Sequence, residues 1–399
     1  MKKLFCILLA LLLLSGCSAQ QDEQVTINVY NWGQYISEGD DGCIDVIAEF
    51  EAAYPNIKVN YVTFDSNETM YTKMAGGGIT VDVIIPSDYM VGRLAQEGML
   101  LPLNFENIPN AQFVDQRFQN PSYDPENKYS VPYSWGTVGI IYNTKYVDEA
   151  DVTGWEILWN ENAAGEQLDY AGKILMFDNS RDAFAIAQCR LGYSMNTTDE
   201  QELLECAKLL EQQRPVVQQY IMDEVFDLME NEEAWIAPYY AGDYLTMSGE
   251  NEDLAFYLPG DQGFNLFVDA MCIPTCCKNQ EAAETFINFL CDPEIAGGNM
   301  DWICYSTPIS AAKAFMELDE EMEAINYPSD EFLDKGTSYL PMPRETTRYV
   351  DSLFMRVRNS ISLEKESGSE VLVWAAVIVA VTAIAGTAFL LLKKRKKKK

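Results

Sequence analysis

The alternation of short apolar strands with amphipathic helices near the start of the chain constrains its fold more than any other feature. The predicted order is strand 25–30, helix 44–53, strand 57–62, helix 67–74, strand 81–85 and helix 87–97. Strands that alternate with helices are typical of a parallel sheet with helices on its faces. We expect Ser87 to cap the last of these helices and Gly98 to end it.

The same pattern restarts in the second half of the chain. The predicted elements there are strand 138–142, a helix that begins at 155–159, strand 173–177, and helices 182–191 and 200–212. Thr198 and Gln201 fit a capping box at the start of the last helix. The sequence therefore predicts two α/β units and no internal repeat.

The two ends of the chain have the pattern of membrane anchors. Residues 1–17 have two lysines, an apolar stretch and a final Leu-Ser-Gly-Cys, which resembles the lipobox of bacterial lipoproteins and implies that Cys17 receives the lipid. Residues 371–392 carry no charge and are long enough to span a bilayer as a helix. Because the basic tail 393–399 follows, it should be cytoplasmic, with the linker 361–370 and all that precedes it outside.

The charge of the chain is strongly negative, with 28 basic residues against 61 acidic ones. Such a surface repels nucleic acid and attracts cations, although a generically acidic soluble surface looks the same. The chain has no histidine, so that a zinc site would need cysteines and carboxylates alone. We predict no metal and no cofactor, and we interpret most of the ten cysteines as small buried hydrophobes.

Aromatic side chains follow two of the predicted strands. Trp32 and Tyr35 come after the first strand, and Tyr89 comes after the third. Ligands of open α/β sheets bind beyond the carboxyl ends of the strands. These aromatic residues are therefore either part of the core or part of a ligand site.

Seven motifs, in the same order along the chain, resemble those of the bacterial spermidine/putrescine-binding proteins, the solute-binding proteins of polyamine ABC transporters. The motifs are residues 30–35, 66–71, 86–89, 131–136, 191–198, 267–270 and 305–308, within a similarity that extends from about 25 to about 358. The resemblance implies a periplasmic-binding-protein fold, in which two α/β lobes joined by a crossover hinge close on the ligand. The implied first lobe is 25–133 with 268–312, and the second is 134–267 with 313–360.

The resemblance also implies a function and a set of site residues. The chain would be a monomer that captures a polyamine and delivers it to the permease subunits of an ABC importer, and it would not be an enzyme. The implied ligand-binding residues are Trp32, Gln34, Tyr35, Ser87, Tyr89, Asn179, Asp182, Tyr239, Phe267, Asp269 and Tyr305.

These residue types suit a polyamine, which is an alkyl chain with ammonium groups. Asp182 and Asp269 can offset the charge of the ammonium groups, and the amides and the serine can accept hydrogen bonds. The aromatic rings suit both the methylenes and the cations. Gln34 and Asn179 are neutral where well-known spermidine receptors have acids, which predicts a less negative pocket and leaves the choice between putrescine and spermidine open.

Three alternatives stay open at this point. The fold could bind another solute, such as ferric ion through the adjacent Tyr239 and Tyr240, or a sugar. It could be a sensor or adhesin for a small ligand, not coupled to transport. An enzyme is disfavoured because the chain has no histidine base, no GxSxG motif and no Walker A motif.

Overall fold

The computed structural model describes residues 24–39, 42–361 and 363. The predicted lipid-attachment residue Cys17, the predicted membrane span 371–392 and the basic tail 393–399 lie outside the described residues. Within the described part, no helix has both the length and the apolar character that crossing a membrane requires.

The first α/β unit contains a parallel sheet, as its strand and helix pattern predicted. Strand β1 (Val25–Trp32) pairs in parallel with β2 (Ile57–Phe64) and β3 (Val83–Ile84). The connecting helices are α2 (Val46–Ala53), α3 (Asn67–Ala75) and α4 (Asp88–Gln96). Ser87 is the N-cap residue of α4, but its hydroxyl makes no capping hydrogen bond, so that part of the prediction is wrong.

The second unit is also parallel. Strand β5 (Ile174–Phe177) lies between β6 (Val217–Ile221) and β7 (Ile236–Tyr240). Its helices are α5 (Ser180–Leu191), α6 (Glu200–Gln213), α7 (Glu224–Glu230), α8 (Ala241–Glu250) and the C-terminal α13 (Arg344–Arg358).

Two local predictions in the second unit are wrong. The N-cap of α6 is Asp199, whose carboxylate accepts from the backbone N–H groups of Gln201 and Glu202. An ionised carboxylate at this position also interacts favourably with the positive end of the helix, so it replaces the predicted Thr198 box. The helix expected to begin at Trp155 is the short 3-10 helix η6 (Trp155–Trp159), which Asn160 ends in a left-handed conformation.

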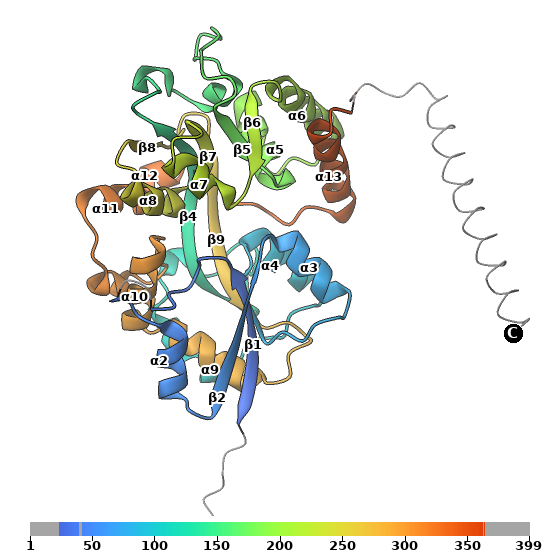
Figure 1. Ribbon diagram of the computed structural model, residues 1–399. Helices are drawn as coiled ribbons and strands as arrows, with labels where there is room; N and C mark the ends of the chain where they lie inside the picture. Colours follow the sequence, from blue (N-terminus) through green and yellow to red (C-terminus); the bar gives the residue numbers. More distant parts are fainter. Residues whose placement is uncertain (1–23, 40–41, 362, 364–399) are drawn as a thin grey trace, which may run out of the picture.

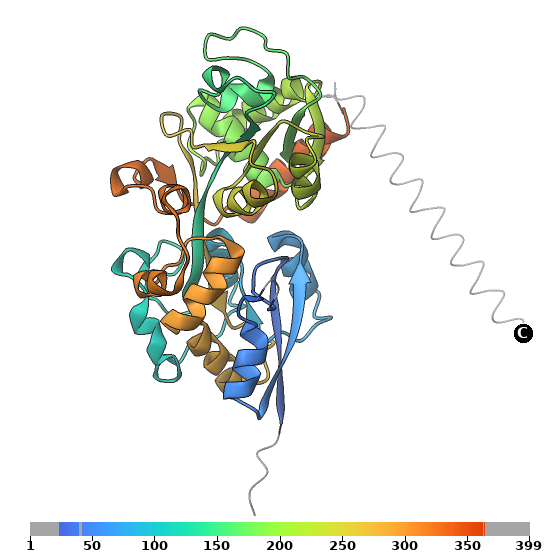
Figure 2. The same ribbon diagram turned by 60° about the vertical axis from the view of Figure 1, so that its left-hand side comes forward.

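Two long antiparallel strands connect the units. Strand β4 (Ser130–Asn143) pairs with β9 (Phe264–Cys272), and the sheet order is β2-β1-β3-β9-β4-β7-β5-β6. Strands β8 (Leu254–Tyr257) and β10 (Gly336–Thr337) pair with β4 and β9. Figures 1 and 2 show β4 running from one unit to the other, with β9 beside it. The sheet is therefore mixed, because β9 runs antiparallel to β3 and β4 runs antiparallel to β7, whereas the strands within each unit are parallel.

The remaining helices cover the outer faces and the connections. They are α9 (Gln280–Leu290), α10 (Pro293–Ile303), α11 (Glu320–Asn326), α12 (Asp330–Leu333), and the 3-10 helices η2 (Phe105–Asn107), η3 (Pro109–Phe113), η4 (Gln116–Phe118), η5 (Glu149–Asp151) and η7 (Ser310–Phe315). Helix α9 packs on α2, where the rings of Phe50 and Phe286 meet edge to face at 4.9 Å. Burying such a ring stabilises the fold by about 1.5–3 kcal/mol.

Candidate functional site

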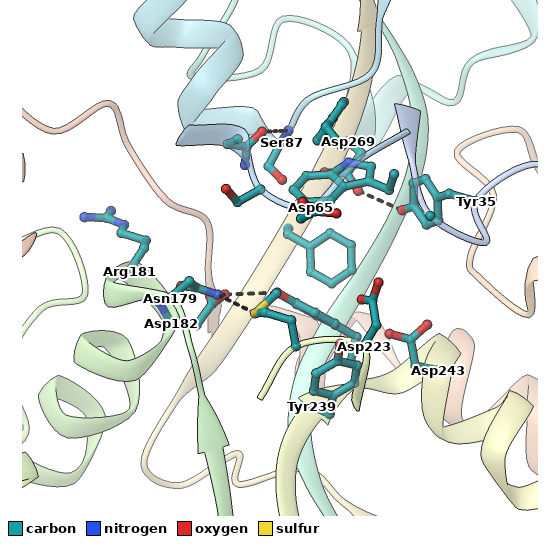
Figure 3. Close-up of a pocket in the computed structure, with 18 of the residues that line it drawn as sticks. Tyr35, Asp65, Ser87, Asn179, Arg181, Asp182, Asp223, Tyr239, Asp243 and Asp269 are labelled. Atoms are coloured by element: carbon teal, nitrogen blue, oxygen red, sulfur yellow. Dashed lines mark hydrogen bonds between the residues drawn. The ribbon is translucent and has the colours of Figure 1, made fainter. Parts of the chain in front are cut away.

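A cleft lies where the loops after β1, β2 and β3 face the loops after β5, β6 and β7. The volume of this cleft is about 1010 Å3 when the part open to solvent is included. All eleven residues that the resemblance implied line this cleft, and Figure 3 shows six of them by name. The fold therefore brings together side chains that are up to 273 positions apart in the sequence, from Trp32 to Tyr305. Their contact with a ligand stays a prediction.

Asp269 is the most deeply placed acid of the predicted set. It lies in the central strand β9, where the backbone of Ala270 donates to Pro86 and so holds β9 against the loop after β3. Its Oδ2 accepts a hydrogen bond of 2.7 Å from the Tyr35 hydroxyl (Figure 3). Its Oδ1 is buried and has no hydrogen-bond partner among the described residues.

The pKa of Asp269 is raised to about 6, mainly by burial and further by the charge of Asp182. The hydrogen bond from Tyr35 and the nearby Ser87 hydroxyl lower this pKa. A buried carboxylate with one unsatisfied oxygen gains from the arrival of a cation, because the cation offsets the cost of desolvation. This part of the cleft is suited to an ammonium group.

Asp182 and Asn179 form a different arrangement. Asn179 caps helix α5, since its Oδ1 accepts from the backbone N–H of Asp182 at 2.8 Å. Its Nδ2 donates to Asp182 Oδ2 at 2.6 Å, which also accepts from the Tyr240 hydroxyl at 2.9 Å. Asp182 Oδ1 accepts from the Tyr339 hydroxyl at 2.8 Å. Both predicted residues line the cleft, but their polar groups already make hydrogen bonds within the protein.

Two acids that sequence analysis missed lie on the same wall as Asp182, at its other end. Asp223 follows β6, Asp243 lies in the first turn of α8, and Figure 3 shows both carboxylates at the opposite end of this wall from Asp182. Desolvation and the nearby Asp223 raise the pKa of Asp243 to about 7, whereas hydrogen bonding from Tyr305 lowers it. Asp65 adds a further acid at the exposed rim. The expected loss of negative charge at Gln34 and Asn179 is therefore offset by acids elsewhere in the cleft.

Aromatic rings form one continuous wall. The ring of Tyr305 meets Tyr35 edge to face at 5.0 Å and Phe267 at 6.2 Å, and Phe267 meets Tyr240 at 5.5 Å. Tyr239 follows at 4.9 Å from Tyr240. Such a wall offers both apolar surface for methylene groups and negative ring faces for cations.

The adjacent tyrosines do not have the character of metal ligands. Burial raises the pKa of Tyr239 and Tyr240 well above 10, and the charge of Asp182 raises that of Tyr240 further. Both phenols are therefore neutral, and the Tyr240 hydroxyl donates to Asp182. Tyr240 would have to give up this hydrogen bond to bind ferric ion, so the geometry does not favour the ferric-ion alternative.

The remaining predicted residues come from the first unit. The indole ring of Trp32 packs 4.7 Å from Phe64, and its Nε1 is buried without a hydrogen-bond partner in the described part of the chain. Gln34 is exposed and has a left-handed backbone with φ of 50°. The hydroxyl of Tyr89 donates to Glu68 at 3.0 Å.

A sequence signal for the missed acids did exist. Asp65, Asp223 and Asp243 follow the carboxyl ends of β2, β6 and β7, which is the position that led to the aromatic loops. Because the sequence pattern did not predict strands β6 and β7, it did not indicate the residues after them as ligand-site residues. Tyr339 follows the two-residue strand β10, which is too short to be recognised from a pattern.

Comparison with known proteins gives a consistent result. A family model described as bacterial extracellular solute-binding protein matches residues 45–324. The spermidine/putrescine-binding periplasmic protein of Escherichia coli is 31% identical over 326 residues, which cover 82% of this chain and 89% of that protein. The putrescine-binding periplasmic protein SpuD of Pseudomonas aeruginosa is 27% identical over 375 residues, covering 90% and 99%.

Solved structures agree with the sequence matches. A putative spermidine/putrescine ABC transporter protein from Listeria monocytogenes superimposes with a TM-score of 0.76 at 35% identity, over 84% of this chain and 98% of that one. A receptor-type binding protein with 15% identity, described as the Atu4243-GABA receptor, has a TM-score of 0.62 and shares the fold.

Proposed function

The chain belongs to the family of bacterial extracellular solute-binding proteins, and we propose that it captures a polyamine outside the cell membrane for delivery to the permease of an ABC importer. Membership of a family of binding proteins confirms the prediction that the chain is not an enzyme. The named relatives bind spermidine or putrescine, which supports the same ligand class for this chain.

One observation carries the assignment to a polyamine. The unsatisfied buried Oδ1 of Asp269 lies in an aromatic-walled cleft whose other side carries Asp223 and Asp243. Carboxylates in two parts of one apolar cleft match an alkyl chain with an ammonium group at each end. A sugar carries no positive charge that could offset these carboxylates.

Capture would involve closure of two lobes. We assign 25–133 with 268–312 to the first lobe and 134–267 with 313–360 to the second, with β4 and β9 as the connection between them. The site residues come from both sides of this connection, so that a bound ligand would favour the closed arrangement. The protein would act as a monomer.

Anchoring at the membrane is part of the proposal. A lipid on Cys17 and a span at 371–392 would hold the chain at the outer face, close to its permease. Cys17→Ala alone and removal of 371–399 alone should each leave the protein in the membrane fraction. The combined change should release it, and retention of the doubly changed chain in that fraction would count against both anchors.

The test of function is ligand-dependent stability of the full chain in detergent. Thermal unfolding is followed with putrescine, spermidine, ferric ion, maltose and a basic amino acid. A ligand at about 100 times its Kd adds about 2.7 kcal/mol to the free energy of unfolding, which shifts the melting temperature measurably. A shift with a polyamine alone is expected. Folded protein that responds to none of the polyamines would refute the assignment.

A further inference from the structure

We propose that Asp182 is a positioning residue whose carboxylate is occupied by phenol hydroxyls, and that the cleft therefore selects diamines over triamines. The inference rests on the proposed function and specifies its ligand. The acids of the cleft differ in how many hydrogen-bond donors their carboxylates already have within the protein.

Asp182 has little capacity left for a ligand. A carboxylate has about four acceptor positions, and three of them on Asp182 are taken by Asn179, Tyr240 and Tyr339. The side chain is 8% exposed. The pKa values of both tyrosines are raised well above 10, mainly by burial, so these hydroxyls keep the protons they donate. An ammonium group that bound Asp182 could use only the one remaining acceptor position, unless it displaced one of these donors.

Tyr339 is itself held in place. The guanidinium of Arg181 lies 4.4 Å from the centre of the Tyr339 ring and donates to Asn196 Oδ1 at 2.9 Å. From the opposite wall, the ring of Tyr89 lies 6.1 Å from that of Tyr339. Tyr339 thus covers Asp182 and narrows this end of the cleft.

Arg181 places a positive charge at the end of the cleft where a third ammonium group would have to bind. It lines the cleft next to Asp182, and Figure 3 shows it on the same side as Asn179 and Asp182, away from Asp223 and Asp243. Arginine stays protonated under all ordinary conditions. A cation at this end would be repelled by Arg181, and the two carboxylates there, Asp182 and Glu68, already accept hydrogen bonds from tyrosine hydroxyls.

The other acids define two cation positions. Asp269 has its unsatisfied Oδ1, and Asp223 with Asp243 forms a pair whose mutual repulsion a cation would relieve. Asp88 also has a buried, unsatisfied oxygen, but its carboxyl interacts electrostatically with Asp269 and therefore belongs to the same position, and Asp65 is exposed to solvent. Two positions for cations match a diamine, whereas a triamine would carry one buried ammonium without a counter-charge.

The test is calorimetric titration of the full chain in detergent with putrescine, 1,5-diaminopentane and spermidine. The unchanged protein should bind its better diamine at least about tenfold more tightly than spermidine. Tyr339→Phe frees Asp182 Oδ1 and should move the ratio toward spermidine at least threefold, with little change for the diamine. Adding Asp182→Asn to Tyr339→Phe should abolish the increase in spermidine affinity, because that increase depends on the negative charge of the Asp182 carboxylate.

Tyr327→Phe is the matched control. Tyr327 is a mostly buried tyrosine away from the cleft, and its hydroxyl accepts from the backbone N–H of Thr307 at 3.1 Å, so its loss should leave the ratio unchanged. Spermidine binding as tightly as the diamines, or a ratio that Tyr339→Phe does not move, would overturn the inference and leave the polyamine function intact. Binding of no polyamine at all would overturn both.

Discussion

Replacing Asp269 by asparagine should have opposite effects on ligand binding and on stability. The change keeps the shape of the side chain and an acceptor for the Tyr35 hydroxyl, 2.7 Å away, but removes the charge. A hydrogen bond to a charged group contributes about 1.5–3 kcal/mol. Loss of that contribution corresponds to a roughly 10- to 150-fold increase in the Kd of a polyamine.

The empty protein should instead become more stable. Burial raises the pKa of Asp269 from 3.8 to about 6. An acid whose pKa is higher in the folded state than in the unfolded state lowers stability above its folded pKa, because the unfolded chain carries the charge more easily. At pH 8, removing this charge should increase the free energy of unfolding by on the order of 3 kcal/mol.

Titration calorimetry and urea unfolding of the same preparations measure the two effects. Asp124→Asn is the control: its buried carboxylate lies outside the cleft and accepts from the backbone N–H groups of Lys128, Tyr129 and Ser130. That change should lower stability and leave the Kd unchanged. If Asp269→Asn lowered stability and left the Kd within twofold, Asp269 would be a structural residue and the reasoning would be wrong.

Two further predictions concern charge and the aromatic wall. Polyamine affinity should fall as the pH is lowered from 8 to 5.5. Asp243 and Asp269 have pKa values of about 7 and about 6, so they bind protons in this range, and these protons compete with the ammonium groups. Below the pKa of each group, the loss of affinity should approach tenfold per pH unit. Over the same range these acids should make the empty protein more stable, and a Kd independent of pH would contradict their role. Gly242→Ala would bring a Cβ to 2.3 Å from the Tyr305 ring, so the ring must move and binding should weaken by roughly tenfold by calorimetry. Gly249→Ala in the same helix meets nothing within 4 Å and should bind normally; equal effects of the two changes would exclude the steric explanation.

Local sequence pattern was sufficient for much of the fold. The strands and helices of the first unit were predicted almost residue by residue, because each buries one face and ends at a glycine, proline or polar cap. The family motifs were sufficient to select eleven residues that all line one cleft. Local pattern failed where the decisive contact is distant: it predicted only residues 138–142 of β4 and did not predict β9, and the antiparallel pairing of these two strands joins the units.

The state of each acid was decided by tertiary structure alone. In the sequence, Asp182 and Asp269 are two equivalent carboxylates after or within apolar strands. The fold gives Asp182 the hydroxyl of Tyr339, 157 positions away, and leaves one oxygen of Asp269 unsatisfied. The composition of a site can be recognised from short motifs, whereas the availability of each charge depends on donors that only the folded chain brings within hydrogen-bonding distance.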